Sequence, residues 1–331
     1  MTQPTNDSDT TLDESTLTVG SDSPYLPNTN IQFAWDSTSI NLIKTCPRLY
    51  QYTMIDGWAS RDESVHLRFG IEYHAAIQMY DSSLANGIPH EDAIHDVIRE
   101  LLIRTEDFHP DESTKAGKYK NRQSLIQLVI DYLDHFKSDY AKTYIKSDGT
   151  AAVELSFRFE LDWGPSSATR PYILCGHIDR VVEFNSQLLV MDHKTTTTTP
   201  SQYYFAQYEP NNQMTLYTLA GQIILNTPIK GVCISAAQIK LVEPNEFIRG
   251  FTYRTPDQLE EWLSDLNLTL QTAEQYATMN YWPMNDTACD KFGGCKFRGI
   301  CSKSPGVREI FLKSDFDKQL PEERWNPLAS R

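Results

Sequence analysis

Residues 172–200 read YILCGHIDRVVEFNSQLLVMDHKTTTTTP, and this stretch decides the fold. Two runs rich in apolar and β-branched residues, 172–184 and 187–193, flank the dipeptide Asn185-Ser186. Runs of this kind around a short polar turn predict a β-hairpin. We therefore expect a sheet to be built around these two strands.

The predicted hairpin carries two carboxylates and an amine. We expect the strand ends to bring Asp179 close to Asp192, and strand alternation places Lys194 on the same face as Asp192. Two carboxylates suit Mg²⁺ or Mn²⁺, which keep water ligands and accept phosphate oxygens. Such an ion would polarise a phosphodiester and lower the pKa of a bound water, which Lys194 would orient. The alternative is that the Asp-x-Lys pattern arises by chance and that Asp179 forms a surface ion pair with Arg180.

The rest of the chain alternates between helical and strand periodicity. Helices are predicted at 40–50, 68–84, 90–106, 121–145, 203–225 and 256–278, and further strands at 152–162, 230–241 and 247–254. This order predicts an α/β fold in which helices flank a mixed sheet. We expect one domain over 31–303, a helical insertion at about 85–148 and a C-terminal extension over 304–331.

Composition excludes several classes of protein. Of the 331 residues, 40% are hydrophobic, which is enough for a buried core. No stretch approaches the roughly 20 apolar residues that span a bilayer, and no basic segment precedes an apolar run at the N-terminus. We therefore expect a cytoplasmic protein with no membrane partner. The absence of a phosphate-binding glycine loop argues against a nucleotide-driven motor.

The formal net charge of −14 opposes nucleic-acid binding, which usually needs an electropositive surface. Part of this charge is local, because residues 1–30 contain five acidic residues and no Lys or Arg. The Ser, Thr, Pro and Asn residues around them predict a disordered acidic tail over 1–30.

Four of the six cysteines lie outside the predicted strands: Cys46, Cys289, Cys295 and Cys301. In a cytoplasmic protein, cysteines more often bind metal or are buried than form disulfides. Four thiolates around one centre suit either Zn²⁺ or an iron–sulfur cluster. A centre joining both ends of the chain would close a very long loop and stabilise the fold. Simple burial is the alternative.

Basic and aromatic residues surround these cysteines: Arg48, Lys291, Phe292, Lys296, Phe297, Arg298 and Lys303. Cations that track phosphates, with rings that stack on bases, are typical of single-strand binding surfaces. The alternative is an ordinary solvated basic face.

Four motifs occur in the order Gly70-x-x-x-His74, Gly176-His-Ile-Asp179-Arg180, Asp192-His-Lys194 and Gln213-x-x-x-Tyr217. Together they resemble the motif set of the RecB-type nucleases in the PD-(D/E)xK superfamily, over residues 35 to 303. The four cysteines are similar to those of its iron–sulfur subgroup, which includes the AddB-type recombination nucleases and the CRISPR-adaptation exonucleases. Five residues separate Cys289 from Cys295, where better-known members have two.

The resemblance implies a restriction-endonuclease-like fold and a role for each motif residue. His74, Asp179, Asp192 and the backbone carbonyl of His193 would bind the metal, and Lys194 would be the catalytic lysine. Ordinary core packing is the alternative for His74.

Further residues complete the implied site. Gln213, Tyr217 and Arg180 would contact substrate, and core packing is the alternative for Tyr217. Glu154 would be an accessory acidic group or a member of a structural ion pair. The four cysteines would hold a [4Fe–4S] cluster, with Zn²⁺ as the alternative.

The implied function is that of a DNA exonuclease. It would act on single strands or free ends in recombination, repair or replication, with a helicase or recombination protein as partner. Two rival hypotheses are a catalytically silent DNA-binding scaffold and a zinc-stabilised interaction protein.

Overall fold

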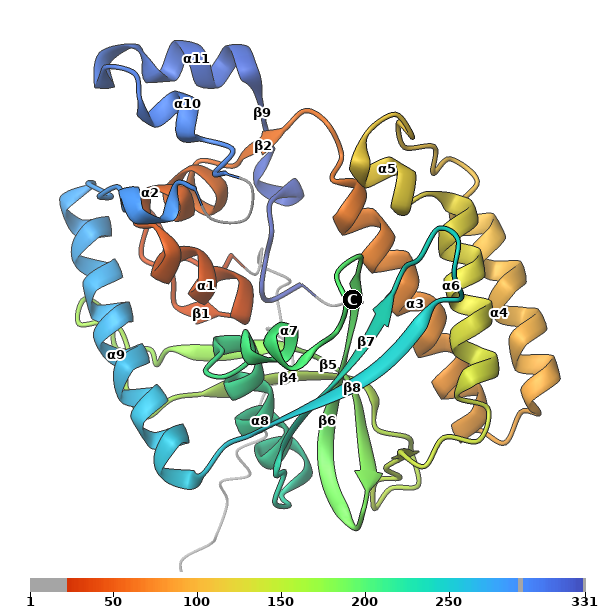
Figure 1. Cartoon of the computed structure of the whole chain (residues 1–331). Helices are drawn as coiled ribbons and strands as arrows, with labels where there is room; N and C mark the ends of the chain where they lie inside the picture. Colours follow the sequence, from red (N-terminus) through yellow and green to blue (C-terminus); the bar gives the residue numbers. More distant parts are fainter. Residues whose placement is uncertain (1–22, 291–293, 330–331) are drawn as a thin grey trace, which may run out of the picture.

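The computed structural model describes residues 23–290 and 294–329, and Figure 1 shows their arrangement. The helices are α1 Ser37–Thr45, α2 Pro47–Tyr50, α3 Val65–Ala85, α4 His90–Arg104, α5 Lys115–Tyr119, α6 Arg122–His135, α7 Gln202–Ala206, α8 Asn212–Leu225, α9 Pro256–Met279, α10 Arg298–Cys301 and α11 Arg308–Asp315. The strands are β1 Ala34–Trp35, β2 Trp58–Ser60, β3 Lys142–Thr143, β4 Val153–Glu160, β5 Ile173–Phe184, β6 Gln187–Thr196, β7 Gly231–Gln238, β8 Glu246–Tyr253 and β9 Phe316–Lys318.

The predicted hairpin is confirmed as β5 and β6. Its two-residue turn has positive φ at both positions, 50° at Asn185 and 59° at Ser186. Such backbone angles match the right-handed twist of the flanking strands, and Asn tolerates them better than most residues. The turn therefore sets the register in which Arg180 pairs with Met191.

The mixed sheet has the order β1-β5-β6-β7-β8, with β3 and β4 also paired to β5. Strand β4 runs antiparallel along one edge of β5. Along the other edge, β1 pairs only with Ile173 and Leu174, and β6 pairs only from Arg180 onward. Beyond Met191, β6 continues beside β7 instead. Strands β5 and β6 therefore diverge, and we call the opening between them the fork.

Helices cover the sheet in two groups. Helices α1, α8 and α9 share one core with the sheet, centred on residues such as Trp35, Leu216 and Leu270. Helices α3, α4 and α6 form a second core, which reaches the sheet at Ala237 and Ile239. Figure 1 shows these two groups on opposite sides of the central strands. The prediction of an α/β mixed sheet flanked by helices is confirmed.

The helix predicted over 121–145 is shorter than expected and ends at His135. The chain beyond it is held by ion pairs and hydrogen bonds from the sheet. Asp139 accepts two hydrogen bonds from Arg249, at 2.7 and 2.6 Å, and the Ala141 carbonyl accepts one from Arg180. These tertiary contacts outweigh the helical preference of the local sequence.

The helix predicted over 203–225 is two helices, α7 and α8. Pro210 lies between them, and a proline inside a helix lacks the N–H that the helical hydrogen bond needs. Asn211 then caps α8, because its side chain accepts hydrogen bonds from the backbone of Gln213 and Met214. Both signals are present in the sequence and were missed.

Both ends of the described chain pack onto the domain. Of the predicted disordered tail, residues 1–22 lie outside the described residues, whereas Leu26 is buried in the main core. In the C-terminal extension, β9 pairs antiparallel with β2, and Trp325 donates a 2.9 Å hydrogen bond to Asp36. These segments are part of the fold because they cover apolar surface that the domain would otherwise expose.

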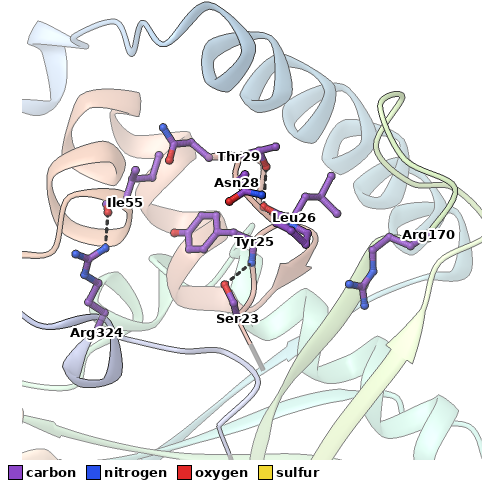
Figure 2. A pocket seen from close by; sticks show the side chains of 10 residues that line it. Ser23, Tyr25, Leu26, Asn28, Thr29, Ile55, Arg170 and Arg324 are labelled. Atoms are coloured by element: carbon purple, nitrogen blue, oxygen red, sulfur yellow. Dashed lines mark hydrogen bonds between the residues drawn. The ribbon is translucent and has the colours of Figure 1, made fainter. Parts of the chain in front are cut away.

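A cavity of about 430 Å³ lies where these end segments meet, lined by Tyr25, Asn28, Arg170 and Arg324 among others (Figure 2). Its two cations already have partners. Arg324 donates to the Ile55 carbonyl, and Arg170 lies 3.4 Å from the centre of the Phe33 ring. No residue of the predicted catalytic site lines this cavity. Separately, no helix among the described residues is long and apolar enough to cross a membrane.

Candidate active site

The fork brings the two predicted carboxylates together. Asp179 and Asp192 are the residues that follow the last Arg180–Met191 pair, one on each diverging strand. They lie inside β5 and β6, not at the strand ends as expected. The backbone N–H of His193 donates a 3.1 Å hydrogen bond to Asp179 Oδ2, which ties β6 to β5 across the fork.

Lys194 links the fork to α8. Its Nζ lies 2.6 Å from Asp192 Oδ2, which confirms that the two side chains share one face of β6. The same Nζ donates a 3.3 Å hydrogen bond to Gln213 Oε1, and Gln213 Nε2 donates to the Tyr217 hydroxyl at 3.0 Å. The four side chains form one continuous polar network from β6 to α8.

His74 reaches the fork from α3. Its Nδ1 lies 3.1 Å from Asp179 Oδ2. Burial lowers the pKa of His74, but the facing Asp179 carboxylate outweighs burial and the net shift is upward. The imidazole is therefore held by a carboxylate in the site and is not an ordinary core residue.

The two carboxylates have pKa values shifted in opposite directions. Burial raises the pKa of Asp179, but His74 and then His193 and Lys194 outweigh it, so the net pKa lies below its ordinary value. Burial also raises the pKa of Asp192, and the nearby Asp179 adds to the rise, so the net shift is upward despite Lys194. Neighbouring carboxyl groups whose pKa values are shifted in opposite directions are typical of functional sites.

His193 contributes its backbone to the fork. Its ring lies among aromatic groups, with centroids 5.7 Å from Tyr132 and 6.0 Å from His74, and burial lowers the pKa of the ring to about 3. Its N–H points at Asp179, and in an extended strand the carbonyl of a residue points to the same edge as its N–H. The carbonyl therefore faces the fork, as a metal ligand would require.

The donors at the fork fit a hard divalent cation. Asp179, Asp192 and the His193 carbonyl offer oxygen atoms, and His74 offers an imidazole, which together suit Mg²⁺ or Mn²⁺. In residues 23–290 and 294–329, no group of three or more His, Cys, Asp or Glu side chains has the spacing of a metal site. The His74 imidazole and the Lys194 ammonium face the carboxylates in this structure.

The family model of the PD-(D/E)XK nuclease superfamily matches residues 35–302. The chain belongs to the PD-(D/E)XK nuclease superfamily. A solved structure from Eubacterium rectale, described as that of a candidate exonuclease, has a similar fold, with a TM-score of 0.50 and 9% sequence identity. The similarity covers 84% of this chain and 92% of that one. No match was found among curated protein sequences.

Arg180, predicted to bind substrate, occupies a different position in this PD-(D/E)XK domain. Its guanidinium lies 2.9 Å from Asp81 and donates hydrogen bonds to Thr143 and to the Ala141 carbonyl. The residue is 7% exposed. Because successive side chains alternate along a strand, Arg180 points away from the face that Asp179 occupies. We therefore interpret Arg180 as a structural ion-pair residue.

Glu154 lies beside the fork on β4. The register of β4 and β5 places it opposite Asp179, and its carboxylate lies 4.0 Å from His177 Nδ1. Its φ of 49° is uncommon for a residue other than Gly and costs roughly 1–2 kcal/mol. Strain of this kind is often found at functional sites, which keeps Glu154 a candidate accessory group.

Two tyrosines of the site were missed from the sequence. Burial raises the pKa of Tyr208, and the neighbouring Tyr204 and then the Asp192 carboxylate raise it further. Their hydroxyls lie 3.3 Å apart. A signal existed, because Tyr204 and Tyr208 are four residues apart between the active strand and the Gln213 motif.

Among residues 23–290 and 294–329, Cys46, Cys289, Cys295 and Cys301 do not have the spacing of a metal site, but contacts link some of these four predicted ligands. Asn285 connects two of them, since its backbone N–H donates to Cys46 Sγ at 3.3 Å and its carbonyl faces Cys289 Sγ at 3.9 Å. Burial raises the pKa of Cys289, and the nearby Cys295 and Cys46 raise it further. Cys301 is likewise close enough to Cys295 for that thiol to affect its pKa.

The predicted base-stacking role of Phe297 is wrong. Phe297 is 1% exposed and belongs to a small core with Tyr52 and Phe316. Arg298 is an exposed cation of this region that pairs with Asp290. Lys296 lies 4.9 Å from the centre of the Phe297 ring, and Lys303 lies 4.8 Å from the centre of the Phe311 ring, which packs against the same small core. The predicted Lys291 and Phe292 lie outside the described residues.

Proposed function

We propose that this member of the PD-(D/E)XK superfamily is a divalent-metal-dependent deoxyribonuclease that acts on single-stranded DNA or on free DNA ends. The observation that carries the proposal is the fork, where Asp179, Asp192 and Lys194 meet from two diverging strands. A buried set of opposite charges in which the two carboxyl groups have oppositely shifted pKa values is typical of a catalytic site.

Asp179, Asp192, His74 and the carbonyl of His193 would hold the metal. When bound, a Mg²⁺ or Mn²⁺ ion supplies a water of lowered pKa and polarises the phosphate oxygens. The hydrogen bond between His193 and Asp179 would fix the carboxylate of Asp179 relative to that of Asp192.

Lys194 would act as a positive hydrogen-bond donor and not as a base. Burial lowers its pKa, but Asp192 outweighs burial and the net shift is upward, so Lys194 keeps its proton at neutral pH. Gln213 holds the ammonium from the side of α8, and Tyr217 in turn holds Gln213. An oriented ammonium would stabilise the charge that develops on the phosphate as water attacks.

We further propose that Cys46, Cys289, Cys295 and Cys301 bind a structural iron–sulfur cluster, with zinc as the alternative. The contacts through Asn285 support this, because they bring residues from opposite ends of the chain next to one another. The centre would staple the C-terminal segment to α1 and α2, which pack beside the sheet that carries the fork.

The test is digestion of labelled DNA. Single- and double-stranded oligonucleotides labelled at the 5′ or 3′ end should be degraded by the wild-type protein with Mn²⁺ or Mg²⁺ and not with EDTA. Asp179→Asn, Asp192→Asn and Lys194→Met should abolish cleavage. Asp134→Asn and Lys137→Met, at an exposed ion pair beside the C-terminal end of α6, are matched controls that should cleave normally.

Two results would contradict the proposal in different ways. Normal cleavage by the three site variants would show that another site is responsible. Failure of the wild-type protein to cleave any of these DNAs with either ion would favour a silent scaffold.

A further inference from the structure

Lys120 is a buried cation beside the active strand. It follows α5 in the helical segment before the sheet and is 6% exposed. Its Nζ donates a 3.1 Å hydrogen bond to the hydroxyl of Thr195, the residue after Lys194 on β6. The same Nζ lies 5.3 Å from the centre of the Phe69 ring on α3. Figure 1 shows α5 next to the N-terminal end of α3.

Among the described residues, Lys120 lacks the anion that Arg180 and Arg249 each have. Arg180 lies 2.9 Å from Asp81, and Arg249 lies 2.6 Å from Asp139. Among the described residues, no carboxylate lies within ion-pair distance of Lys120, and burial alone lowers its pKa to about 8. A hydroxyl and a ring face compensate poorly for the lost hydration of an ammonium. An anion brought next to Lys120 would therefore offset the cost of burying its charge.

An open strip of α3 connects Lys120 to the fork. His66, Gly70 and His74 are spaced by four residues and so share one face of the helix. A Cβ added at Gly70 would meet no atom within 4 Å, so the space over Gly70 is open. Burial lowers the pKa of His66, and the charge of Lys120 lowers it further. The two side chains are therefore neighbours. From His74 to His66 the helix rises about 12 Å, the length of a few stacked nucleotides.

We infer that Lys120 binds a backbone phosphate of the nucleic-acid strand, beyond the cleaved bond, and that this strand runs along α3 over Gly70. The inference rests on the proposed function, which supplies the strand. Lys120 would read charge and not base identity, because an ammonium on a phosphate carries no sequence information. Its contact with Thr195 ties the ammonium to β6 on the face opposite to that of Lys194.

The test compares Lys120→Met with Lys118→Met, which removes an exposed lysine from α5. Binding of a fluorescent single-stranded oligonucleotide is measured by anisotropy in Ca²⁺, at several salt concentrations. Lys120→Met should weaken binding about tenfold, since a charge-assisted hydrogen bond is lost. The plot of log K against log salt concentration should become less steep by about one unit, which corresponds to the loss of one phosphate contact. Lys118→Met should change neither quantity.

Single methylphosphonate substitutions locate the phosphate. In the wild-type protein, one neutralised position away from the cleaved bond should weaken binding. In Lys120→Met, the same substitution should have no further effect. Removing an unpaired buried charge should leave the midpoint of thermal unfolding of Lys120→Met unchanged or higher. If Lys120→Met fails to fold, Gly70→Leu should weaken oligonucleotide binding by filling the strip.

The outcomes separate this inference from the proposed function. If the wild-type protein cleaves DNA but Lys120→Met binds with the affinity and salt slope of Lys118→Met, the inference is overturned and the nuclease stands. If the wild-type protein binds DNA through Lys120 but never cleaves it, the inference stands and the nuclease fails. A wild-type protein that binds no oligonucleotide overturns the inference.

Discussion

The Asp192–Lys194 pair allows a prediction that needs no assay of activity. Lys194→Met removes the ammonium 2.6 Å from Asp192, a residue that is 1% exposed, and replaces it with an apolar chain of similar length. Breaking a buried ion pair costs about 3–5 kcal/mol, and the 25% exposure of the Lys194 side chain favours the lower end. We expect a loss of about 3 kcal/mol at pH 7, or roughly 5 °C in the unfolding midpoint.

Protonation of Asp192 sets a ceiling on this loss. Protonating a carboxylate whose pKa has the ordinary value of about 3.9 costs about 4 kcal/mol of free energy at pH 7 and about 1.5 kcal/mol at pH 5. In the variant, the folded pKa of Asp192 lies above its unfolded value, so the folded state takes up a proton as the pH falls. The destabilisation should therefore shrink by half or more between pH 7 and pH 5.

Two further variants complete the experiment, which is urea or thermal unfolding followed by circular dichroism. Asp192→Asn combined with Lys194→Met should recover most of the lost stability, because no unpaired charge remains. Mg²⁺ should stabilise Lys194→Met more than the double variant, since only the single variant keeps the carboxylate. A Lys194→Met protein that unfolds like the wild type at pH 7, with no dependence on pH, would refute the reasoning.

Three more predictions address other parts of the molecule. Gln213→Leu removes the acceptor that holds Lys194 from α8, so kcat for DNA cleavage should fall about tenfold with little change in KM, and an unchanged kcat would exclude a positioning role. Burial raises the pKa of Asp81 to about 6, so the folded state gains a proton between pH 7 and pH 5 that the unfolded state does not. Protonation of Asp81 should therefore increase the stability of the fold as the pH falls. Asp81→Asn should lack this increase when its unfolding midpoints at pH 7 and pH 5 are compared with those of the wild type. Finally, anaerobically purified protein should absorb visible light through an iron–sulfur cluster, and Cys46→Ser should reduce both the absorbance and the unfolding midpoint. Colourless wild-type protein with one zinc per chain would contradict the cluster.

Local patterns predicted much of the central sheet. The turn at Asn185-Ser186 follows from two β-type runs that flank a short polar dipeptide. The shared face of Asp192 and Lys194 follows from the twofold period of a strand. The link between Gln213 and Tyr217 follows from the helical period, because residues four apart lie on one face. The break at Pro210 could also have been predicted, since proline and a capping Asn are both local signals.

Other features depend on contacts that no local pattern contains. Arg180 follows Asp179 directly, yet it is buried on the other face by Asp81, which lies about a hundred residues earlier in the chain. The end of α6 is decided by Arg249, whose ion pair with Asp139 competes with continued helix. That no described residue places an anion beside Lys120 is visible only once its surroundings are known.

The amino-acid sequence by itself determined the hairpin, the residue types of the site and the pairs joined by strand or helix spacing. Those relations are set by backbone periods that act over a few residues. The tertiary structure alone decided that β6 leaves β5 after Met191, so that Asp179 and Asp192 face a shared opening, and that α3 places His74 against it. The physical reason is that a fork and a helix packed beside it minimise the free energy of the whole core, to which residues far apart in the chain contribute together.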